Sequence, residues 1–280
     1  MLFVGVGVVS AINCNFESIN LNNKIGKLKS DKKTFYPSDD SWVSHDESNV
    51  PKGDSVDFLI RNEYGFGGSP GWAVDSLVKF DISSIPKGTI INSAKLKLFY
   101  YKYRDNNPGG RELNVYKVIS DWDENTVTWD TQPIYHSIPT TSSSVPSSIG
   151  SWMEWDVTND VQDFIDRTVT NYVWKITDEN YWGKTWIPII HFRSKEYSSN
   201  LPYLEIEVIE LRSALLFGRI KNLNAEGNLI TFNAVNLRYL QFLPFSFNTY
   251  ISGEKIVASE VKFGILTINF AFGFFKAALV

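Results

Sequence analysis

The chain has 280 residues, of which 43% are hydrophobic and 21% are charged, so it is able to bury a core and is not a disordered sequence. A single cysteine excludes an internal disulfide and a cysteine-based zinc site, and three scattered histidines argue against a histidine-rich metal centre. The net charge of −4 argues against nucleic-acid binding, which needs a basic face, so no nucleic-acid partner is expected.

The N-terminal end, residues 1–23, is typical of a signal sequence. Its first residues, MLFVGVGVVSA, are apolar and end in small side chains suited to cleavage, although no basic residue precedes them. A buried N-terminal strand is the alternative, because a run this short cannot span a bilayer. The basic, polar stretch 24–33 is predicted to be a linker, so the folded part is expected to begin near Thr34.

The stretch 34–209 is predicted to be an all-β sandwich of antiparallel strands. Short runs of β-branched and aromatic residues are separated by turn residues. Near the end of the stretch, Leu204, Ile206 and Val208 alternate with two glutamates, which indicates a strand with one buried and one wet face. The expected strands are residues 77–82, 94–101, 113–119, 126–129 and 203–209.

Residues 157–165 (VTNDVQDFI) are the one stretch with a clear helical pattern. Thr158 or Asn159 is expected to cap its N-terminus, since both side chains accept hydrogen bonds from the first turn. The apolar residues recur at helical spacing. The buried stripe is expected to be Val161, Phe164 and Ile165.

Residues 210–280 differ from the rest in charge and pattern. Residues 211–280 carry seven basic and three acidic side chains, a net charge of +4, which leaves −8 on the first 210 residues. The apolar end, 264–280, is interrupted by Asn269 and Lys276 and falls short of the roughly 20 apolar residues that a spanning helix needs. Its Phe- and Ile-rich runs predict a small additional β-rich region, with a membrane-associated segment as the alternative.

Four segments of the middle stretch follow one another in a recognisable order. They are SLVKFDISSIPKGTIINSAKLKL (76–98), VYKVISDWDENTVTW (115–129), WDVT (155–158), and the pair FRSKE and PYLEI (192–196 and 202–206). Together they resemble the signature of DNRLRE domains, the disaggregatase-related modules also classed as carbohydrate-binding module family 96. The resemblance covers about residues 34–209.

What this resemblance implies is a jelly-roll β-sandwich on a secreted or cell-surface protein that binds acidic or other polysaccharides. Two positions depart from the family's pattern. Asp75 stands where arginine is common, and Val173 stands where glycine is common. The first departure removes a positive charge near a possible glycan face, which puts the binding of an anionic polymer in doubt.

Cations and aromatic residues on outward strand faces are the candidate ligand-binding residues. Lys79 alternates with core residues on either side, so it is expected to face outward and attract a uronate carboxylate. On the next strand, Lys97, Tyr101 and Tyr103 are expected to share one face, where tyrosine rings would support a sugar. An ordinary solvated sheet face is the alternative. The full candidate set is Lys79, Lys97, Tyr101, Tyr103, Arg193, His191, Tyr181, Trp182 and Trp186.

The last five of these come from a later part of the stretch. Residues 181–186 hold three large aromatic side chains in a predicted loop, where exposed rings often bind ligands. Trp182 and Trp186 plugging one end of the sandwich is the alternative. His191 and Arg193 are expected to share a strand face and to hydrogen bond glycan hydroxyls or carboxylates, unless the histidine is structural.

No sequence motif points to catalysis or to a resident cofactor. Residues 121–125 (DWDEN) begin like a calcium loop, but Thr126 stands where glycine is needed and Gln132 where a bidentate glutamate is needed, which excludes an EF-hand. We therefore predict no catalytic residue and no metal-ligand set. A structural calcium ion stays open, with candidate ligands Asp39, Asp40 and Asp57.

The sequence thus predicts a secreted or cell-surface, non-catalytic module that binds a polysaccharide on the sheet face of Lys79, Lys97 and Tyr101. A structural protein of the cell surface is the second hypothesis. It would self-associate or contact the surface through residues 211–280. A polysaccharide lyase or hydrolase is the third.

Overall fold

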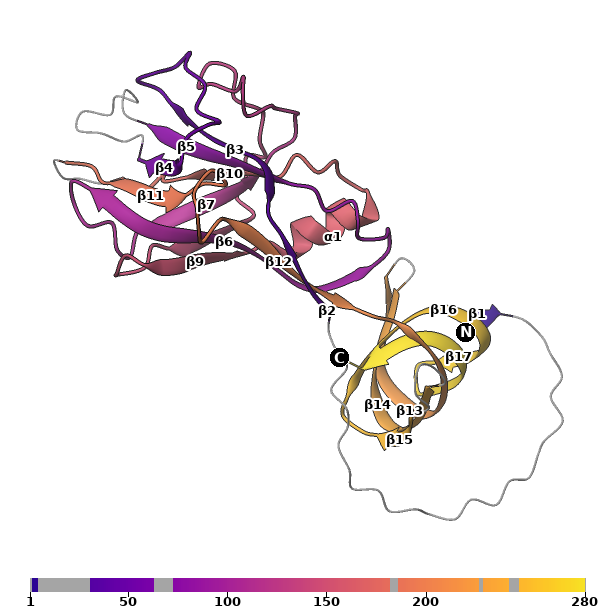
Figure 1. Cartoon of the computed structure of the whole chain (residues 1–280). Coiled ribbons are helices and arrows are strands. Elements are labelled where there is room, and N and C mark those ends of the chain that lie inside the picture. Colours follow the sequence, from indigo (N-terminus) through magenta and orange to yellow (C-terminus); the bar gives the residue numbers. More distant parts are fainter. Residues whose placement is uncertain are drawn as a thin grey trace, which may run out of the picture. The chain divides into compact units, whose positions relative to one another are not determined.

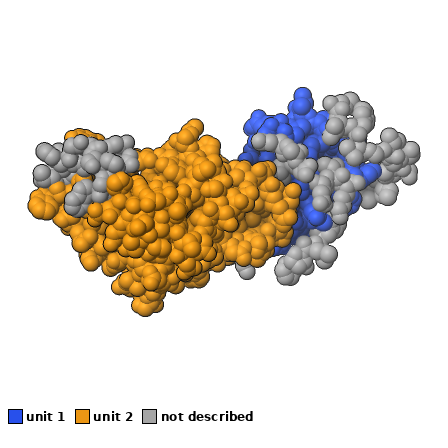
Figure 2. Space-filling model, turned by 90° about the horizontal axis from the view of Figure 1, so that it is seen from above, with its two compact units in different colours: residues 1–30, 209–280 blue, residues 31–208 orange. Residues whose placement is uncertain are grey.

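The structure, a computed structural model, describes residues 2–4, 31–62, 73–181, 186–226, 229–241 and 247–279. The chain divides into two compact units, residues 31–208 and residues 1–30 with 209–280, coloured orange and blue in Figure 2. Each unit has its own hydrophobic core. The expected all-β sandwich is confirmed, and the one helix in the described ranges is α1 (Thr158–Asp166).

Eleven strands lie in the described part of the unit of residues 31–208. They are β2 (Asp31–Phe35), β3 (Pro37–Ser44), β4 (Asp57–Arg61), β5 (Val74–Phe80), β6 (Ile90–Arg104), β7 (Glu112–Lys117), β8 (Thr141–Ser144), β9 (Ser151–Asp156), β10 (Trp174–Thr177), β11 (Ile189–Arg193) and β12 (Tyr203–Ile209). Hydrogen-bonded neighbours follow the order β2-β12-β6-β11-β4-β5-β10-β7-β8, with β3 on β5 and β9 on β6. β2 includes residues 31–33, which were expected to be linker.

These antiparallel strands curl into two layers around the core. In Figure 1, β3, β5 and β10 form the upper layer, and β6, β9 and β12 form the lower one. Alternation places the apolar side chains between the layers, as expected: Leu96 and Leu98 are fully buried, whereas Lys97 faces outward. Trp155 and Trp174 are also buried, and each indole N–H has an oxygen acceptor, at 3.0 and 2.9 Å.

The connection after β7, residues 119–136, covers the outward face of the β3–β5–β10 layer. It supplies Trp122 and Val127 to a second apolar cluster that includes Val43 and Leu77. The strand expected at 126–129 is wrong. The backbone forms turns there, because Asp123 accepts from the N–H groups of the residues three and four positions later.

In α1 the expected stripe of Val161, Phe164 and Ile165 is buried. The expected cap is wrong, since Val157 occupies the N-cap position and no side chain caps the helix. The Thr158 hydroxyl donates to Asp156 at 2.6 Å and accepts the backbone N–H of Ala94 at 2.9 Å. Thr158 therefore joins the helix to β6 and does not cap it.

The second unit confirms the expected β-rich region. Its strands are β1 (Leu2–Val4), β13 (Arg212–Glu226), β14 (Leu229–Gln241), β15 (Phe247–Ile251), β16 (Lys255–Thr267) and β17 (Phe270–Leu279). The sheet closes on itself, because β16 and β13 each pair with both β17 and β14. Gly264 and Gly273 face each other in this ring at φ +154° and +149°, and a Cβ on Gly273 would lie 2.5 Å from the Gly264 Cα.

The apolar chain ends are accounted for only in part. β1 pairs with β16, which agrees with the alternative prediction of an N-terminal strand. The rest of the predicted signal sequence lies outside the described residues. The signal sequence therefore stays a prediction. Within the described ranges, no helix combines the length and the hydropathy that a bilayer crossing requires.

Candidate functional site

Side chains from four strands and from the loop after β11 form a row on the outward side of β6. We call this surface, made of Phe99, Tyr101, Trp152, Arg193, Tyr197 and Tyr203, the aromatic face. The Trp152 ring lies 4.9 Å from the Tyr203 ring and 5.2 Å from the Phe99 ring, both edge-on. All six side chains are half-buried, so the row is partly open to solvent.

Arg193 lies at the centre of the aromatic face. Its guanidinium carbon is 4.2 Å from the centroid of the Tyr197 ring and 4.8 Å from that of Phe99. One guanidinium nitrogen donates to the carbonyl and hydroxyl of Ser199, at 2.8 and 2.9 Å. Within the described ranges Arg193 forms no ion pair, and its Nε atom is buried without a hydrogen-bond partner. Its charge is therefore held in place but not neutralised.

Lys97 lies beside this row but is already neutralised. Its ammonium is 2.9 Å from Glu154 and 3.8 Å from Glu205. Burial alone would lower the pKa of Lys97, but the hydrogen bond and charge of Glu154 outweigh burial and raise it. Lys97 thus stays protonated as part of a carboxylate network and offers little charge to a ligand.

His191 and Tyr101 form a polar network with Asp57 beneath the row. The Tyr101 hydroxyl donates to one Asp57 oxygen, and the other lies 3.3 Å from His191 Nδ1. Burial, opposed in part by Asp57, lowers the pKa of His191, so the ring is neutral at pH 7. His191 is 4% exposed, and this favours the structural alternative for it.

Tyr103 does not share the face of Lys97 and Tyr101, and that expectation is wrong. Lys102 pairs with His191, whereas Tyr100 pairs with Phe192, so β6 has a bulge at the intervening residue. Beyond the bulge Tyr103 pairs with Ile190, which is fully buried on the core side. One extra residue therefore reverses the alternation.

Lys79 also departs from its expected role. It faces away from Val78 and Phe80, as expected, but its face is covered by the 119–136 connection. Its ammonium bonds the Trp122 carbonyl at 2.6 Å and Asp121 at 3.1 Å, and its side chain is 19% exposed. Lys79 is thus on a different layer from Lys97 and anchors the connection.

The aromatic loop is described only in part. Tyr181 and Trp186 are 77% and 73% exposed, so Trp186 does not plug the sandwich. The Trp186 carbonyl accepts from Asn106 at 2.7 Å. Trp182 lies outside the described residues. Tyr181 and Trp186 remain candidate contacts for a ligand.

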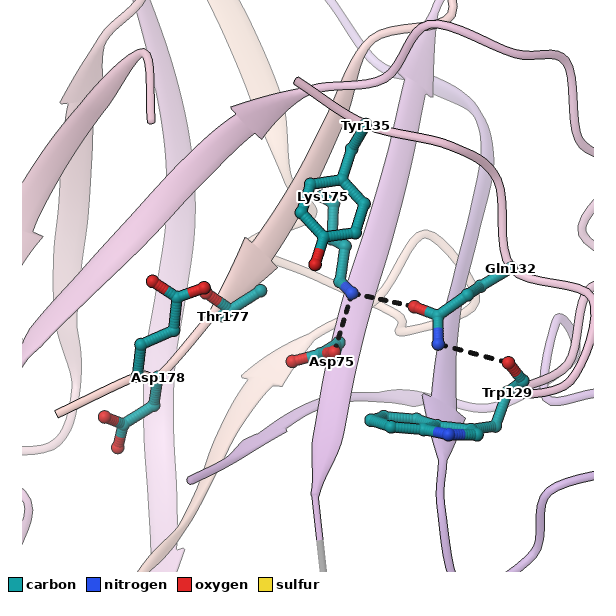
Figure 3. Close-up of a pocket in the computed structure, with 8 residues that line it drawn as sticks. Asp75, Trp129, Gln132, Tyr135, Lys175, Thr177 and Asp178 are labelled. Atoms are coloured by element: carbon teal, nitrogen blue, oxygen red, sulfur yellow. Dashed lines mark hydrogen bonds and ion pairs between the residues drawn. The ribbon is translucent and has the colours of Figure 1, made fainter. Parts of the chain in front are cut away.

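A small pocket opens between the 119–136 connection and strands β5 and β10 (Figure 3). Its volume is about 140 Å³. Lys175 lies in its base, 2.9 Å from Asp75 and 2.7 Å from the Gln132 side-chain oxygen, with its ammonium 4.2 Å from the centroid of the Tyr135 ring. The lining residues are Asp75, Trp129, Gln132, Tyr135, Lys175, Thr177, Asp178 and Glu179.

Two of the three carboxylates named as candidate calcium ligands hydrogen bond to other groups of the protein, and the calcium ion stays an expectation. Asp57 serves His191 and Tyr101, and Asp40 accepts the Lys195 backbone N–H at 2.7 Å. The nearby Glu124 and Glu196 are bridged by the Lys195 ammonium, at 3.0 and 2.7 Å. A lysine thus supplies the positive charge there, and the described residues hold no group of three or more metal-ligating side chains.

The alternation of core and outward residues along the strands predicts part of the aromatic face. Trp152 precedes the core residue Met153, and Phe99 follows the core residue Leu98, so parity alone places both outward. The candidate set omitted both. The pocket has no comparable local signal, because its walls come from segments about 50 residues apart in the sequence.

Residues 31–208 match the sequence model of a known family, described as carbohydrate-binding module family 96. The match coincides with the compact unit of the same residues and excludes the second unit. No curated protein matches the chain.

Proposed function

Because the chain belongs to carbohydrate-binding module family 96 through residues 31–208, we propose that it binds a polysaccharide on the aromatic face and catalyses no reaction on it. Family membership identifies carbohydrate as the kind of partner. The proposal adds the surface, the class of glycan and the absence of turnover.

The observation that carries this proposal is the state of Arg193. Its guanidinium is stacked among three rings, and the described residues offer it no carboxylate. An arginine fixed in this way loses little side-chain freedom when it binds a carboxylate, which it recognises with paired hydrogen bonds. The half-buried rings of Phe99, Trp152 and Tyr203 extend from it and would support successive sugar rings.

These features favour a polysaccharide that contains uronate units. Lys102 and Arg104 are exposed on the same strand as Tyr101, and Lys102 pairs with His191, two positions from Arg193 on β11. An open face suits an internal stretch of a long chain better than a chain end. Such polymers occur outside cells, and we therefore propose a secreted or cell-surface location.

The test is affinity of the full chain for alginate and polygalacturonate, measured by calorimetry, with starch as the neutral polymer. Arg193→Gln is expected to lower affinity for the acidic polymers about tenfold or more, because a charge-assisted hydrogen bond is lost. Arg193→Lys keeps the positive charge but cannot form the paired hydrogen bonds of a guanidinium. Its affinity therefore separates the effect of the charge from that of the paired hydrogen bonds. Lys95→Gln is the matched control, since Lys95 lies on β6, the strand next to that of Arg193, but is paired with Glu154 at 3.0 Å.

The salt dependence of binding is a second test of the same proposal. Raising the salt to about 1 M shortens the screening length to about 3 Å and should weaken binding of the acidic polymers. Unchanged affinity in Arg193→Gln, or equal affinity for starch, would contradict recognition of a uronate by this arginine. Cleavage of either polymer would contradict the absence of turnover.

A further inference from the structure

We propose that the pocket between the 119–136 connection and strands β5 and β10 is a second carbohydrate site, and that it takes a single neutral sugar residue (Figure 3). Its residues are distinct from those of the aromatic face. The inference goes beyond the proposed function and does not depend on that function being correct.

The first argument is an unsatisfied hydroxyl in the pocket wall. Thr177 is 4% exposed, and its hydroxyl oxygen has no hydrogen-bond partner. Burying a hydroxyl without a partner costs free energy, and nearly all buried polar groups are therefore paired. Thr177 lines the pocket, and a rotation of its side chain toward the pocket would let a ligand hydroxyl supply the missing partner.

The second argument is that the other polar groups are already held in position. The Lys175 ammonium bonds Asp75 and Gln132, and the Gln132 amide donates to the Trp129 carbonyl at 3.1 Å. Figure 3 shows these groups converging on the space beside the Trp129 and Tyr135 rings. A ring wall beside fixed hydrogen-bonding groups is suited to a sugar, which has an apolar face and a rim of hydroxyls.

The third argument is the charge of the lining. Three carboxylates and one ammonium surround the pocket. Asp178 is neutralised by Arg111 at 2.7 Å, and Asp75 by Lys175. Glu179 accepts from the Tyr116 hydroxyl at 2.5 Å and from the Asn114 amide at 2.9 Å and forms no ion pair among the described residues. The excess is negative, so sugar hydroxyls are favoured and a uronate carboxylate is repelled.

The fourth argument is size. The pocket is small, with a volume of about 140 Å³. Pockets for drug-sized ligands are larger, about 300–1,000 Å³. One sugar residue, as a free monosaccharide or at the end of a chain, is therefore the size of ligand that we expect in this pocket.

The experiment follows the backbone and indole N–H signals of the isotope-labelled full chain by NMR. The probes are D-glucose, D-galactose, D-mannose and D-glucuronate, each added up to about 100 mM, because a single sugar is expected to bind with Kd on the order of 1 mM. At least one neutral hexose should shift the Trp129 indole and Thr177 amide signals. Glucuronate should bind more weakly, and Glu179→Gln should narrow that difference.

Thr177→Val tests the hydroxyl directly. It removes no hydrogen bond of the folded protein, so its thermal midpoint should not fall, whereas hexose affinity should drop about three- to tenfold. Thr177→Ser keeps the hydroxyl and should retain binding. If no hexose moves the Trp129 and Thr177 signals, or if Thr177→Val binds as tightly as the natural chain, the pocket is not a sugar site.

Trp152→Ala separates this inference from the proposed function. It alters the aromatic face and leaves the pocket intact, so hexose shifts at Trp129 should be unchanged. Loss of polysaccharide binding in Arg193→Gln together with unchanged hexose shifts shows two independent sites. Loss of the hexose shifts in Trp152→Ala would overturn the assignment to the pocket.

Discussion

The buried carboxyl group of Asp40 should make the stability of residues 31–208 depend on pH. Asp40 is 1% exposed. Burial raises its pKa from 3.8 to about 8, with a smaller contribution from Glu196 and an opposing one from the Lys195 backbone N–H. One Glu196 oxygen is buried without a partner, and a protonated Asp40 would donate to it.

The direction and size of the effect follow from these two pKa values. Between pH 4 and pH 8 folded Asp40 holds a proton that the unfolded chain has released. The free energy of unfolding therefore falls as the pH rises, by up to about 1.4 kcal/mol per pH unit. The upper limit over the whole window is about 6 kcal/mol. His191 acts in the opposite direction near pH 6, because burial lowers its pKa.

Asp40→Asn isolates the contribution of Asp40 from that of His191 and the other groups. An asparagine amide is able to donate to Glu196 and accept from Lys195 without ionising. Urea unfolding at pH 5, 6, 7 and 8 should show the variant gaining stability relative to the natural chain as the pH rises. Asp39→Asn, at the half-buried neighbouring position, is the control. If the natural chain and Asp40→Asn show the same pH dependence, the reasoning is wrong.

Asp160 accepts hydrogen bonds from Thr140, Lys117 and Trp174 at 2.6 to 2.9 Å. Asp160→Ala should therefore lower the free energy of unfolding, measured in urea, by about 3 kcal/mol. A loss below about 1 kcal/mol would contradict a buried network. Gly273→Ala should lower the free energy of unfolding of the second unit by about 3 kcal/mol. The calorimetric transition of residues 31–208 should not change. Gly253→Ala, with open space around its Cβ, should cost only about 1 kcal/mol, and an equal loss in both variants would refute the clash.

The contact between Asp40 and Glu196 was not predictable from the sequence. Asp40 was considered only as a possible calcium ligand, together with Asp39 and Asp57. Its partners Glu124 and Lys195 lie 84 and 155 residues away, and the pairing depends on how β3 is placed against the loop after β11. No local sequence pattern indicates which residues so far apart in the chain come into contact.

The aromatic face was half predictable for the same reason. Alternation placed Lys97 and Tyr101 outward, and it also holds for Trp152, which was overlooked. Alternation failed at Tyr103, because the bulge in β6 forms only against β11. The charge that each cation offers was not predictable, since Glu154 neutralises Lys97 across a strand pair and no acidic side chain reaches Arg193 among the described residues.

The sequence by itself determined most of the β-strand content, the family and the faces of the strands that have no bulge, because these depend on residue types and on neighbours two positions apart. Only the tertiary structure decided that Lys79 is covered, that Arg193 is stacked and not paired with a described carboxylate, and that the Thr177 hydroxyl is buried without a partner in the wall of a pocket. Those outcomes depend on segments far apart in the chain, whose contacts are set by packing of the whole sandwich.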